Sequence, residues 1–296
     1  LSFDRFTVWS RRLDPRLLEA DGVDGLAAPR EHAVDQPVLH RLLGAEEVVA
    51  VEVTDVTEER AVIGVQGPLS RALLSELTEA DLSNEGFPFL TTQELELAGV
   101  RVRALRVTFV GELGWELHVP RDGARAVYLA LKEAGEQHGL VDAGYRATES
   151  LRLEKGYRIW GRDITPDSTP IEAGLSFATK LKGDISFLGR DALIAQREAG
   201  APTKRLATFS VEDPDCILLG RETIYRDGER AGYITSGGWG YTIGAAVGMG
   251  YVRTAPAISR EELLSSSYEL EVATERVPCQ VTLSPLYDPK REKVLA

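Results

Sequence analysis

Six short segments rich in β-branched and aromatic residues follow one another in the last third of the chain. They are residues 205–211, 222–226, 232–235, 245–251, 268–272 and 277–282. Glycine-rich turns separate them, and Asp227-Gly228 is a strong hairpin turn between two of them. Segments this short and this closely spaced predict a β-barrel or sandwich of about 90 residues.

The region before residue 200 shows a different pattern. Strand-like segments are expected at 48–53, 60–65, 95–97, 100–109 and 115–119. Helices are expected at 68–77, at 124–138 with Gly139 as its C-cap, at 143–155 with Gly156 at its end, and at 190–198. Strands and helices alternate without a long parallel series, which predicts an α+β fold.

Three domains are expected from these changes of pattern. Residues 1–46 form a divergent N-terminal segment without sustained periodicity, and residues 47–200 form an α+β core. Residues 201–296 form a C-terminal β-barrel, and Ala199-Gly200-Ala201-Pro202 is a plausible boundary.

Charge and composition exclude several classes of protein. The net charge of −12 argues against general nucleic-acid binding, although one or two local arginines could still hold a small anion. No run of about 18–20 apolar residues predicts a membrane span, and the charged first residues predict no signal peptide. Cys216 and Cys279 fit no disulfide framework, and the four histidines have no metal-ligand spacing. We therefore expect a cytoplasmic protein without a metal.

The segment FVGELGWELHVP, residues 109–120, contains the first candidate site residue. A period of two places Trp115, Leu117 and Val119 on one face of a strand, and Glu116 and His118 on the other. A carboxylate there can accept two parallel N–H bonds from the edge of a flat heterocycle such as a pterin. Because exposed Glu is the rule, spacing alone favours a hairpin with a solvated Glu face.

The second candidate segment is residues 151–163, a helix end that leads into a loop with two aromatic residues. Arg152 stands between two leucines, which favours a partly buried guanidinium. Such an arginine needs a carboxylate from a neighbour or a ligand. The alternative is an arginine at a helix end that is favoured by the helix dipole.

A third segment, residues 234–244, contains GxGxxxG from Gly238 to Gly244. The residues after it are β-like and no βαβ unit follows, so a dinucleotide-binding loop is rejected. We expect a glycine-rich turn at the rim of the barrel.

Several motifs together resemble the aminomethyltransferase (glycine cleavage T-protein) family, in particular the folate-binding half of sarcosine and dimethylglycine dehydrogenases. They are residues 109–120, 151–181 and 235–252 together with FLGRDAL at 187–193. PLYDP, residues 285–289, resembles the usual ending of the family, so a complete C-terminus is expected. The resemblance covers about residues 47–296 and implies an intertwined ferredoxin-like folate-binding core, N-terminally incomplete here, followed by a small barrel.

The resemblance also implies roles for individual residues. Glu116 matches the pterin-binding Glu of the family, Arg152 matches the Arg of its RLE motif, and Trp160 stands where members often have Tyr. Phe109 matches a family Tyr, so the ring is kept and the hydroxyl lost. Asp4 is a weak match for the family's catalytic carboxylate, which lies just before a strand resembling DDLTV.

The resemblance implies tetrahydrofolate as cofactor and a small amine-derived one-carbon donor. The leading hypothesis is an aminomethyl-transfer module that forms 5,10-methylenetetrahydrofolate. The alternative is a non-catalytic folate-binding fragment, or a subunit of a flavin-dependent sarcosine or dimethylglycine dehydrogenase. No flavin site is expected in this chain, since it has no counterpart of the dehydrogenases' flavin domain, so the flavin would belong to a partner or to a missing domain.

Overall fold

The computed structural model describes residues 7–11 and 56–296. These residues form two compact units. The sheet unit comprises residues 7–11, 56–148 and 290–296, and the barrel unit comprises residues 149–289. Together they confirm the expected α+β class with a C-terminal barrel.

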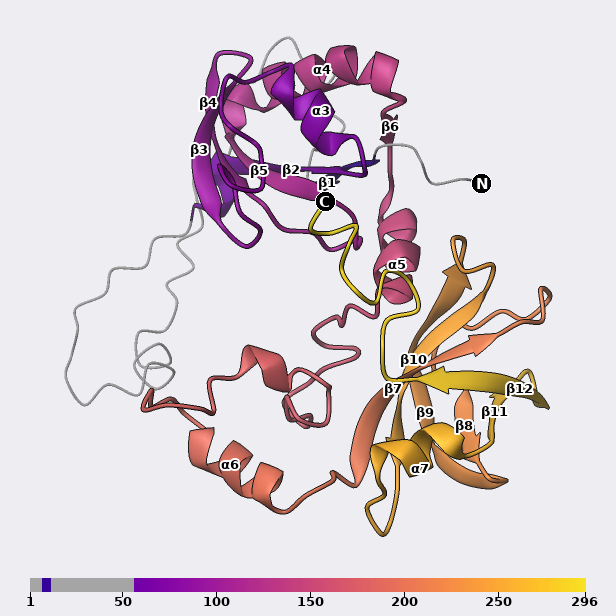
Figure 1. Ribbon diagram of the computed structural model, residues 1–296. Helices are drawn as coiled ribbons and strands as arrows, with labels where there is room; N and C mark the ends of the chain where they lie inside the picture. The colour runs from indigo at the N-terminus through magenta and orange to yellow at the C-terminus, as the bar shows by residue number, and fades with distance from the viewer. Residues whose placement is uncertain (1–6, 12–55) are drawn as a thin grey trace. The chain divides into compact units, whose positions relative to one another are not determined.

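A six-stranded mixed sheet forms the centre of the sheet unit (Figure 1). Its strands are β1 (Thr7–Arg11), β2 (Arg60–Gln66), β3 (Thr92–Leu97), β4 (Val100–Leu105), β5 (Gly114–Pro120) and β6 (Val141–Asp142). Their order in the sheet is β3-β4-β5-β2-β1-β6. Neighbouring strands are antiparallel except β1 and β6, which are parallel.

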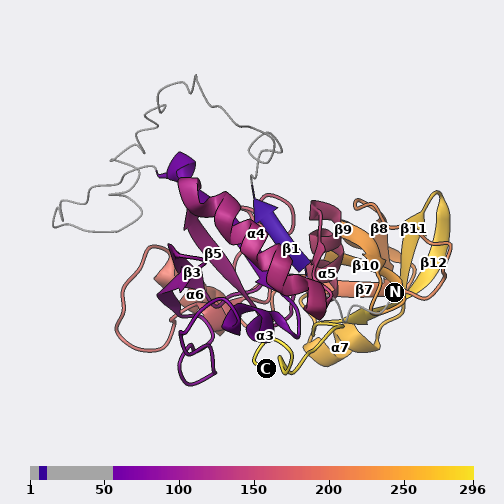
Figure 2. The same cartoon turned by 90° about the horizontal axis from the view of Figure 1, so that it is seen from above.

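Two helices, α3 (Ser70–Ser75) and α4 (Ala124–Gly135), pack on one face of this sheet, and Figure 2 shows α4 lying along the strands. Their apolar residues join a core built from alternate residues of the strands. Trp115 is fully buried in this core and meets Phe87 edge-on at 6.1 Å between ring centroids. Glu116 and His118 therefore lie on the opposite face of the sheet.

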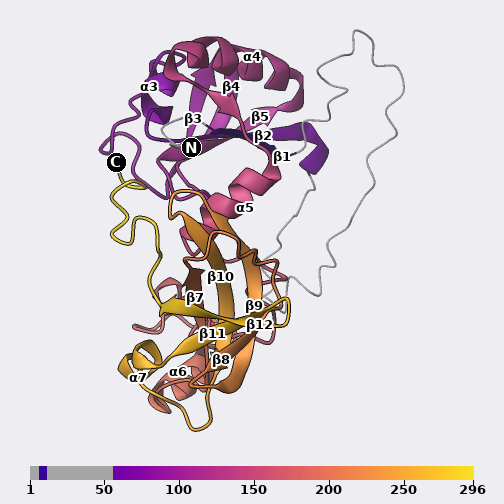
Figure 3. The ribbon, with the colours of Figure 1, turned by 90° about the vertical axis from the view of Figure 1, so that its right-hand side faces the viewer.

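The barrel unit contains a closed six-stranded barrel in the order β10-β7-β12-β11-β8-β9 (Figure 3). The strands are β7 (Lys204–Val211), β8 (Thr223–Arg226), β9 (Glu229–Gly240), β10 (Ala245–Arg253), β11 (Tyr268–Val272) and β12 (Glu275–Thr282). Closure decides between the barrel and the sandwich that the sequence left open. The barrel interior is apolar and includes Phe209 and Tyr268, whose ring centroids lie 5.7 Å apart.

Three α-helices accompany the barrel or lead into it: α5 (Tyr145–Glu154), α6 (Arg190–Glu198) and α7 (Arg260–Ser265). Short 3₁₀ turns lie at Thr57–Glu59, Arg121–Gly123, Glu136–His138 and Ser176–Ala178. Gly139 follows the third of these turns in the left-handed conformation at φ 71°, as expected for the C-cap of the region begun by α4.

Most expected elements recur with shifted ends, and three expectations are corrected. The strand expected at 100–109 ends at Leu105. Helix α7 was not expected, although Ser259-Arg260-Glu261-Glu262 is a capping-box sequence and Ser259 Oγ accepts a hydrogen bond from the Glu262 amide at 3.0 Å. The turn expected at 234–244 is instead largely strand, because β9 continues to Gly240.

The glycines of β9 explain why this segment stays extended. A Cβ on Gly237 would lie 2.8 Å from the main chain of Leu218, so the strand passes closer to its neighbour than any other residue would allow. These glycines serve close packing in addition to turn formation.

Some expectations remain predictions. The strand expected at 48–53 and the segment 1–46 lie outside the described residues, apart from β1. The expected domain boundaries at 46/47 and 200/201 also stay predictions. Within the described part of the chain, no helix is both long and apolar enough to cross a membrane.

Candidate functional site

Glu116 lies in the middle of β5, where the structure confirms the expected alternation. Trp115, Leu117 and Val119 are fully buried, whereas Glu116 and His118 are half-buried on the other face. The Glu116 side chain keeps 27% of its surface exposed, and its Oε2 lies 3.9 Å from His118 Nε2. The carboxylate is thus held on a rigid central strand with part of its surface open.

The neighbours of Glu116 in the sheet are a glycine on one strand and a leucine on the other. Glu116 pairs with Gly64 of β2 on one side and with Leu105 of β4 on the other. Directly opposite residues of an antiparallel pair carry side chains on the same face, about 5 Å apart. Because Gly64 has no side chain, no Cβ occupies the position next to the carboxylate on that side.

Phe109 lies in the turn between β4 and β5 and is half-buried. Thr108 Oγ1 accepts hydrogen bonds from the amides of Val110 and Gly111, at 3.2 and 3.1 Å. At the end of the turn, the carbonyl of Leu113 accepts a bond from the Gly67 amide at 2.8 Å. Phe109 and Glu116 therefore belong to one ordered strand–turn–strand region of the sheet unit.

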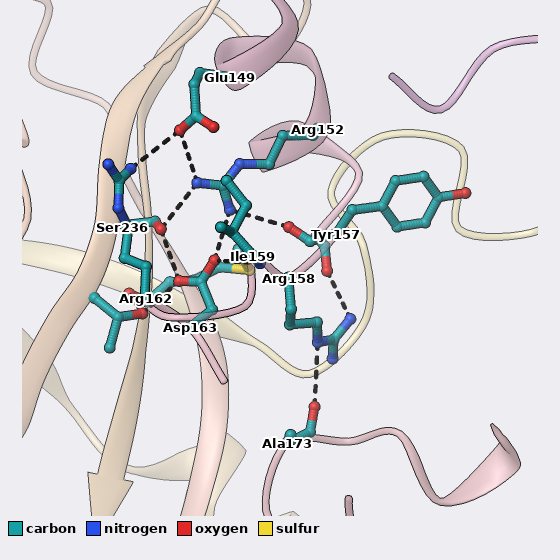
Figure 4. A network of polar contacts seen from close by, with 12 residues as sticks. Glu149, Arg152, Tyr157, Arg158, Ile159, Arg162, Asp163, Ala173 and Ser236 are labelled. Atoms are coloured by element: carbon teal, nitrogen blue, oxygen red, sulfur yellow. Dashed lines mark hydrogen bonds and ion pairs between the residues drawn. The ribbon is translucent and has the colours of Figure 1, made fainter. Parts of the chain in front are cut away.

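Arg152 lies at the end of α5 in the barrel unit, and 1% of it is exposed (Figure 4). Its guanidinium donates to Asp163 Oδ2 at 2.7 Å and to Glu149 Oε2 at 2.9 Å. It also donates to Ser236 Oγ at 2.9 Å and to the Tyr157 carbonyl at 3.0 Å. The carboxylates that the buried arginine needs are therefore supplied by neighbouring residues.

Asp163 is the residue of this network that the sequence did not single out. It is fully buried, and its Oδ1 accepts bonds from Thr235 Oγ1 at 2.6 Å and Ser236 Oγ at 2.7 Å. Its Oδ2 also accepts from the Ile159 amide at 3.0 Å. The need of Arg152 for a carboxylate was the available sequence signal, but nothing local indicated which acid supplies it.

The loop between Arg152 and Asp163 is held by further buried polar contacts. Arg158 donates to the carbonyls of Gly156 at 2.6 Å and Ala173 at 3.1 Å. Burial lowers the pKa of the Arg158 guanidinium, and the charge of Asp163 opposes that shift. The Tyr251 hydroxyl donates to the Asp163 carbonyl at 2.9 Å, and burial raises the pKa of this tyrosine.

Trp160 lies at the tip of the same loop with 68% of its surface exposed. A single parallel bridge to Ile164 accompanies it. The structure thus brings Arg152 and Trp160 into one loop region of the barrel unit, and Phe109 and Glu116 into one region of the sheet unit. Asp4 lies outside the described residues.

Two further residues that sequence reasoning missed, the last residue of α5 and the residue after it, bind other parts of the barrel unit. Glu154 Oε1 accepts from the amides of Thr242 and Ile243, at 2.7 and 3.2 Å. Lys155 Nζ forms a buried ion pair with Asp288 Oδ2 at 2.7 Å. Arg152, Glu154 and Lys155 thus join one helix end to three other segments of the barrel unit. The sequence signal for these contacts was the run of charged residues RLEK, residues 152–155.

Among the described residues, no cluster of three or more His, Cys, Asp or Glu side chains could hold a metal ion. The two thiols belong to the barrel core and its margin. Burial raises the pKa of Cys279 to about 12 and also raises that of Cys216. Neither thiol is suited to act as a nucleophile near neutral pH.

Comparison with known proteins places this chain in a family. The model of the GCVT N-terminal domain matches residues 30–183, and the model of the glycine cleavage T-protein C-terminal barrel domain matches residues 204–288. Human mitochondrial sarcosine dehydrogenase is 44% identical over 245 residues. Human mitochondrial dimethylglycine dehydrogenase is 35% identical over 246 residues.

These alignments cover 82% of this chain, which spans only 26% and 28% of the length of the two dehydrogenases. Among solved structures, the glycine cleavage system aminomethyltransferase T from Bartonella henselae matches with a TM-score of 0.65 at 27% identity. That match covers 78% of this chain and 60% of the other. The family models, the relatives and the fold agree, and the chain belongs to the glycine cleavage T-protein (aminomethyltransferase) family.

Proposed function

We propose that this chain is a tetrahydrofolate-dependent one-carbon transfer module of aminomethyltransferase type. It would form 5,10-methylenetetrahydrofolate from a methylamine- or glycine-type donor. The observation that carries the proposal is the half-exposed carboxylate of Glu116, fixed on a central strand opposite the side-chain-free Gly64. Family membership supports the same reading.

Glu116 fits the pterin of tetrahydrofolate by its chemistry. A carboxylate accepts hydrogen bonds only, and the pterin edge presents a ring N–H next to an exocyclic amine. Gly64, directly opposite Glu116 on β2, places no side chain between the carboxylate and a flat ring. Bound tetrahydrofolate supplies the amine nitrogens that take up a carbon at the oxidation level of formaldehyde.

The other proposed site residues have supporting roles. Phe109 provides an apolar ring surface on the sheet unit and Trp160 an exposed one on the barrel unit, and both stay proposed folate-binding residues. Arg152 acts through the loop that it holds, because its two terminal nitrogens donate to Asp163, Glu149, Ser236 and a carbonyl. Asp4 remains the proposed catalytic carboxylate that orients the folate amine.

Calorimetric titration of the purified chain with tetrahydrofolate tests the proposal. Glu116→Gln keeps the shape of the side chain but replaces one acceptor oxygen with a donor. We expect its affinity for tetrahydrofolate to fall about tenfold to a hundredfold, the value of a charge-assisted hydrogen bond. The matched control, Glu96→Gln, changes an exposed Glu on β3 and should bind as the unaltered chain does. Equal affinity in both variants would contradict the role of Glu116.

A second candidate function follows from the lengths of the relatives. Because the chain spans about a quarter of sarcosine dehydrogenase, it could serve as the folate-binding part or subunit of a flavin-dependent dehydrogenase without transferring carbon alone. Formation of methylenetetrahydrofolate by the purified chain, faster than the uncatalysed reaction, supports the transfer module. Folate binding without acceleration, together with copurification of a yellow partner, supports the second candidate.

Partners and location remain proposals. We propose a folate, a small amine-derived donor and a flavoprotein as partners, with no nucleic acid and no membrane. The absence of a flavin site from this chain and a cytoplasmic location also stay predictions, and the two human dehydrogenases are mitochondrial by name.

A further inference from the structure

Gln66, the last residue of β2, is a buried polar side chain with an unused acceptor. Only 4% of Gln66 is exposed. Its Oε1 is buried and has no hydrogen-bond partner among the residues that the structure describes. A buried acceptor without a partner is costly, and a donor brought by a ligand would satisfy it. The role inferred for it rests on the proposed folate-binding function.

The orientation of the Gln66 amide follows from its neighbours. Nε2 faces two main-chain carbonyls, those of Val107 and Trp115, each at 3.4 Å. Carbonyl oxygens can only accept, so the atom that faces them is the NH₂ group and the other atom is the oxygen. Both bonds are longer than the usual 2.7–3.2 Å, which leaves the amide free to adjust to a ligand.

The sheet register places this oxygen on the same face as Glu116. Gln66 pairs with Gly114, and Gly64 pairs with Glu116. A Cβ built on Gly114 would lie 2.1 Å from Gln66 Oε1 and 2.5 Å from the Val65 carbonyl oxygen, so the amide oxygen packs against the side-chain-free face of Gly114. Gly114 and Glu116 are two residues apart on one strand, a spacing of about 7 Å.

Gln66 Oε1 and the Glu116 carboxylate are therefore two acceptors on one sheet face, at neighbouring positions of the β2–β5 pair. In the β2–β5 pair, Gly114 lies opposite Gln66 and Gly64 lies opposite Glu116. Neither glycine contributes a side chain to this face. Gln66 also contacts the turn that carries Phe109, through the Val107 carbonyl. Because Oε1 is buried, contact with a ligand ring would require this turn to shift.

The chemistry of the ring decides what a second acceptor can do. Glu116 recognises the amine and the adjacent ring N–H, which oxidised and reduced pterins share. The nitrogens N5 and N8 carry hydrogen only in the reduced ring, and in folic acid both are bare acceptors. A carbonyl oxygen that faces one of them gains a hydrogen bond with tetrahydrofolate and meets a lone pair in folic acid.

We propose that Gln66 Oε1 accepts a hydrogen bond from N5–H or N8–H of the reduced pterin, and that this contact selects tetrahydrofolate over oxidised folate. Glu116 then binds the amine and ring N–H that all pterins share, and Gln66 distinguishes the reduced ring from the oxidised ring. Gly114 is required because any side chain at that position would displace the amide oxygen.

The test compares dissociation constants for tetrahydrofolate, kept anaerobic, and for folic acid. We expect the unaltered chain to prefer tetrahydrofolate by about tenfold or more, the effect of one hydrogen bond made or lost in a buried site. Gln66→Met, of similar length but without the amide, should abolish this preference, and Gln66→Ala serves the same purpose if the Met variant does not fold.

Controls separate the inference from the proposed function. Gln93→Met makes the same chemical change on β3, where Gln93 Nε2 donates to the Gly86 carbonyl, and should leave the preference unchanged. Glu116→Gln should weaken binding of both folates. A preference that survives in Gln66→Met, or equal binding of both folates by the unaltered chain, overturns the role of Gln66 and leaves the proposed function standing. Binding of neither folate overturns both.

Discussion

Buried ionic residues at the end of α5 and in the loop after it hold segments of the barrel unit together through polar contacts. Arg152 and Asp163 are almost inaccessible, and each uses its donors or acceptors on several partners. A buried ion pair of this kind adds little to the free energy of unfolding when it is compared with apolar residues of the same shape in its place. Loss of one partner alone is costly, because the other charge is left buried and uncompensated.

Arg152→Met should therefore lower the free energy of unfolding by about 3–5 kcal/mol. Urea titration followed by circular dichroism measures this change. Arg162→Met is the matched control, because Arg162 is half-exposed and pairs with the same Glu149 at 3.1 Å. An exposed pair contributes about 1 kcal/mol or less, so the control should change little. A loss below about 1 kcal/mol in Arg152→Met would show that the pair is not the anchor of this loop.

Two neighbouring glycines of β9 differ in how closely other atoms approach them, so comparing them tests whether close packing requires glycine in this strand. A Cβ on Gly237 would meet main-chain and Cβ atoms of Leu218 at 2.8 Å, a contact that needs backbone movement. A Cβ on Gly238 would meet only the end of the Leu153 side chain at 3.4 Å, an ordinary van der Waals distance. The strand is extended at both positions.

Gly237→Ala should destabilise the chain by about 1–3 kcal/mol, as expected for overpacking against a backbone. Gly238→Ala should be neutral or slightly stabilising, because alanine restricts the unfolded chain and fits an extended strand. Thermal unfolding of both variants side by side measures the difference. If the two variants have the same melting temperature, the close approach of β9 to Leu218 is not the reason that Gly237 must be glycine.

Local patterns predicted the elements better than they predicted their limits. The alternation in residues 115–119 predicted β5 and both of its faces, because the period of two is a property of the strand itself. The glycine-rich segment 234–244 was expected to be a turn, because glycine in isolation favours turns. Its pairing with β10 across Gly237, Gly238 and Gly240 keeps it in the sheet, and that pairing depends on a second strand.

The described residues divide into two units, and the barrel unit contains its own buried polar contacts and its own apolar core. In the barrel unit, Arg152 binds the loop at Asp163, Glu154 binds the turn at Thr242, and Lys155 binds Asp288. All of these contacts begin and end within residues 149–289. The barrel also has its own closed apolar core.

A fragment of residues 145–289, which keeps α5 whole, should therefore fold by itself. We expect a cooperative thermal transition by circular dichroism and the exchange-protected amides of a closed barrel. Lys155→Met in this fragment removes the partner of buried Asp288 and should lower its melting temperature. A fragment that melts without a cooperative transition would show that the barrel unit depends on residues outside this range.

The sequence by itself determined the α+β class, the short strands of the C-terminal region, the faces of β5 and membership of the family, because these depend on short-range periodicity and on contiguous motifs. It also predicted that Glu116 lies on the face of β5 opposite Trp115, and that Arg152 needs a carboxylate. Only the tertiary structure decided that Asp163 and Ser236 meet Arg152, and that Gln66 lies over Gly114. Ser236 and Arg152 are 84 residues apart in the chain, and Gln66 and Trp115 are 49 apart. Contacts at such separations follow from strand register and packing, which no local pattern encodes.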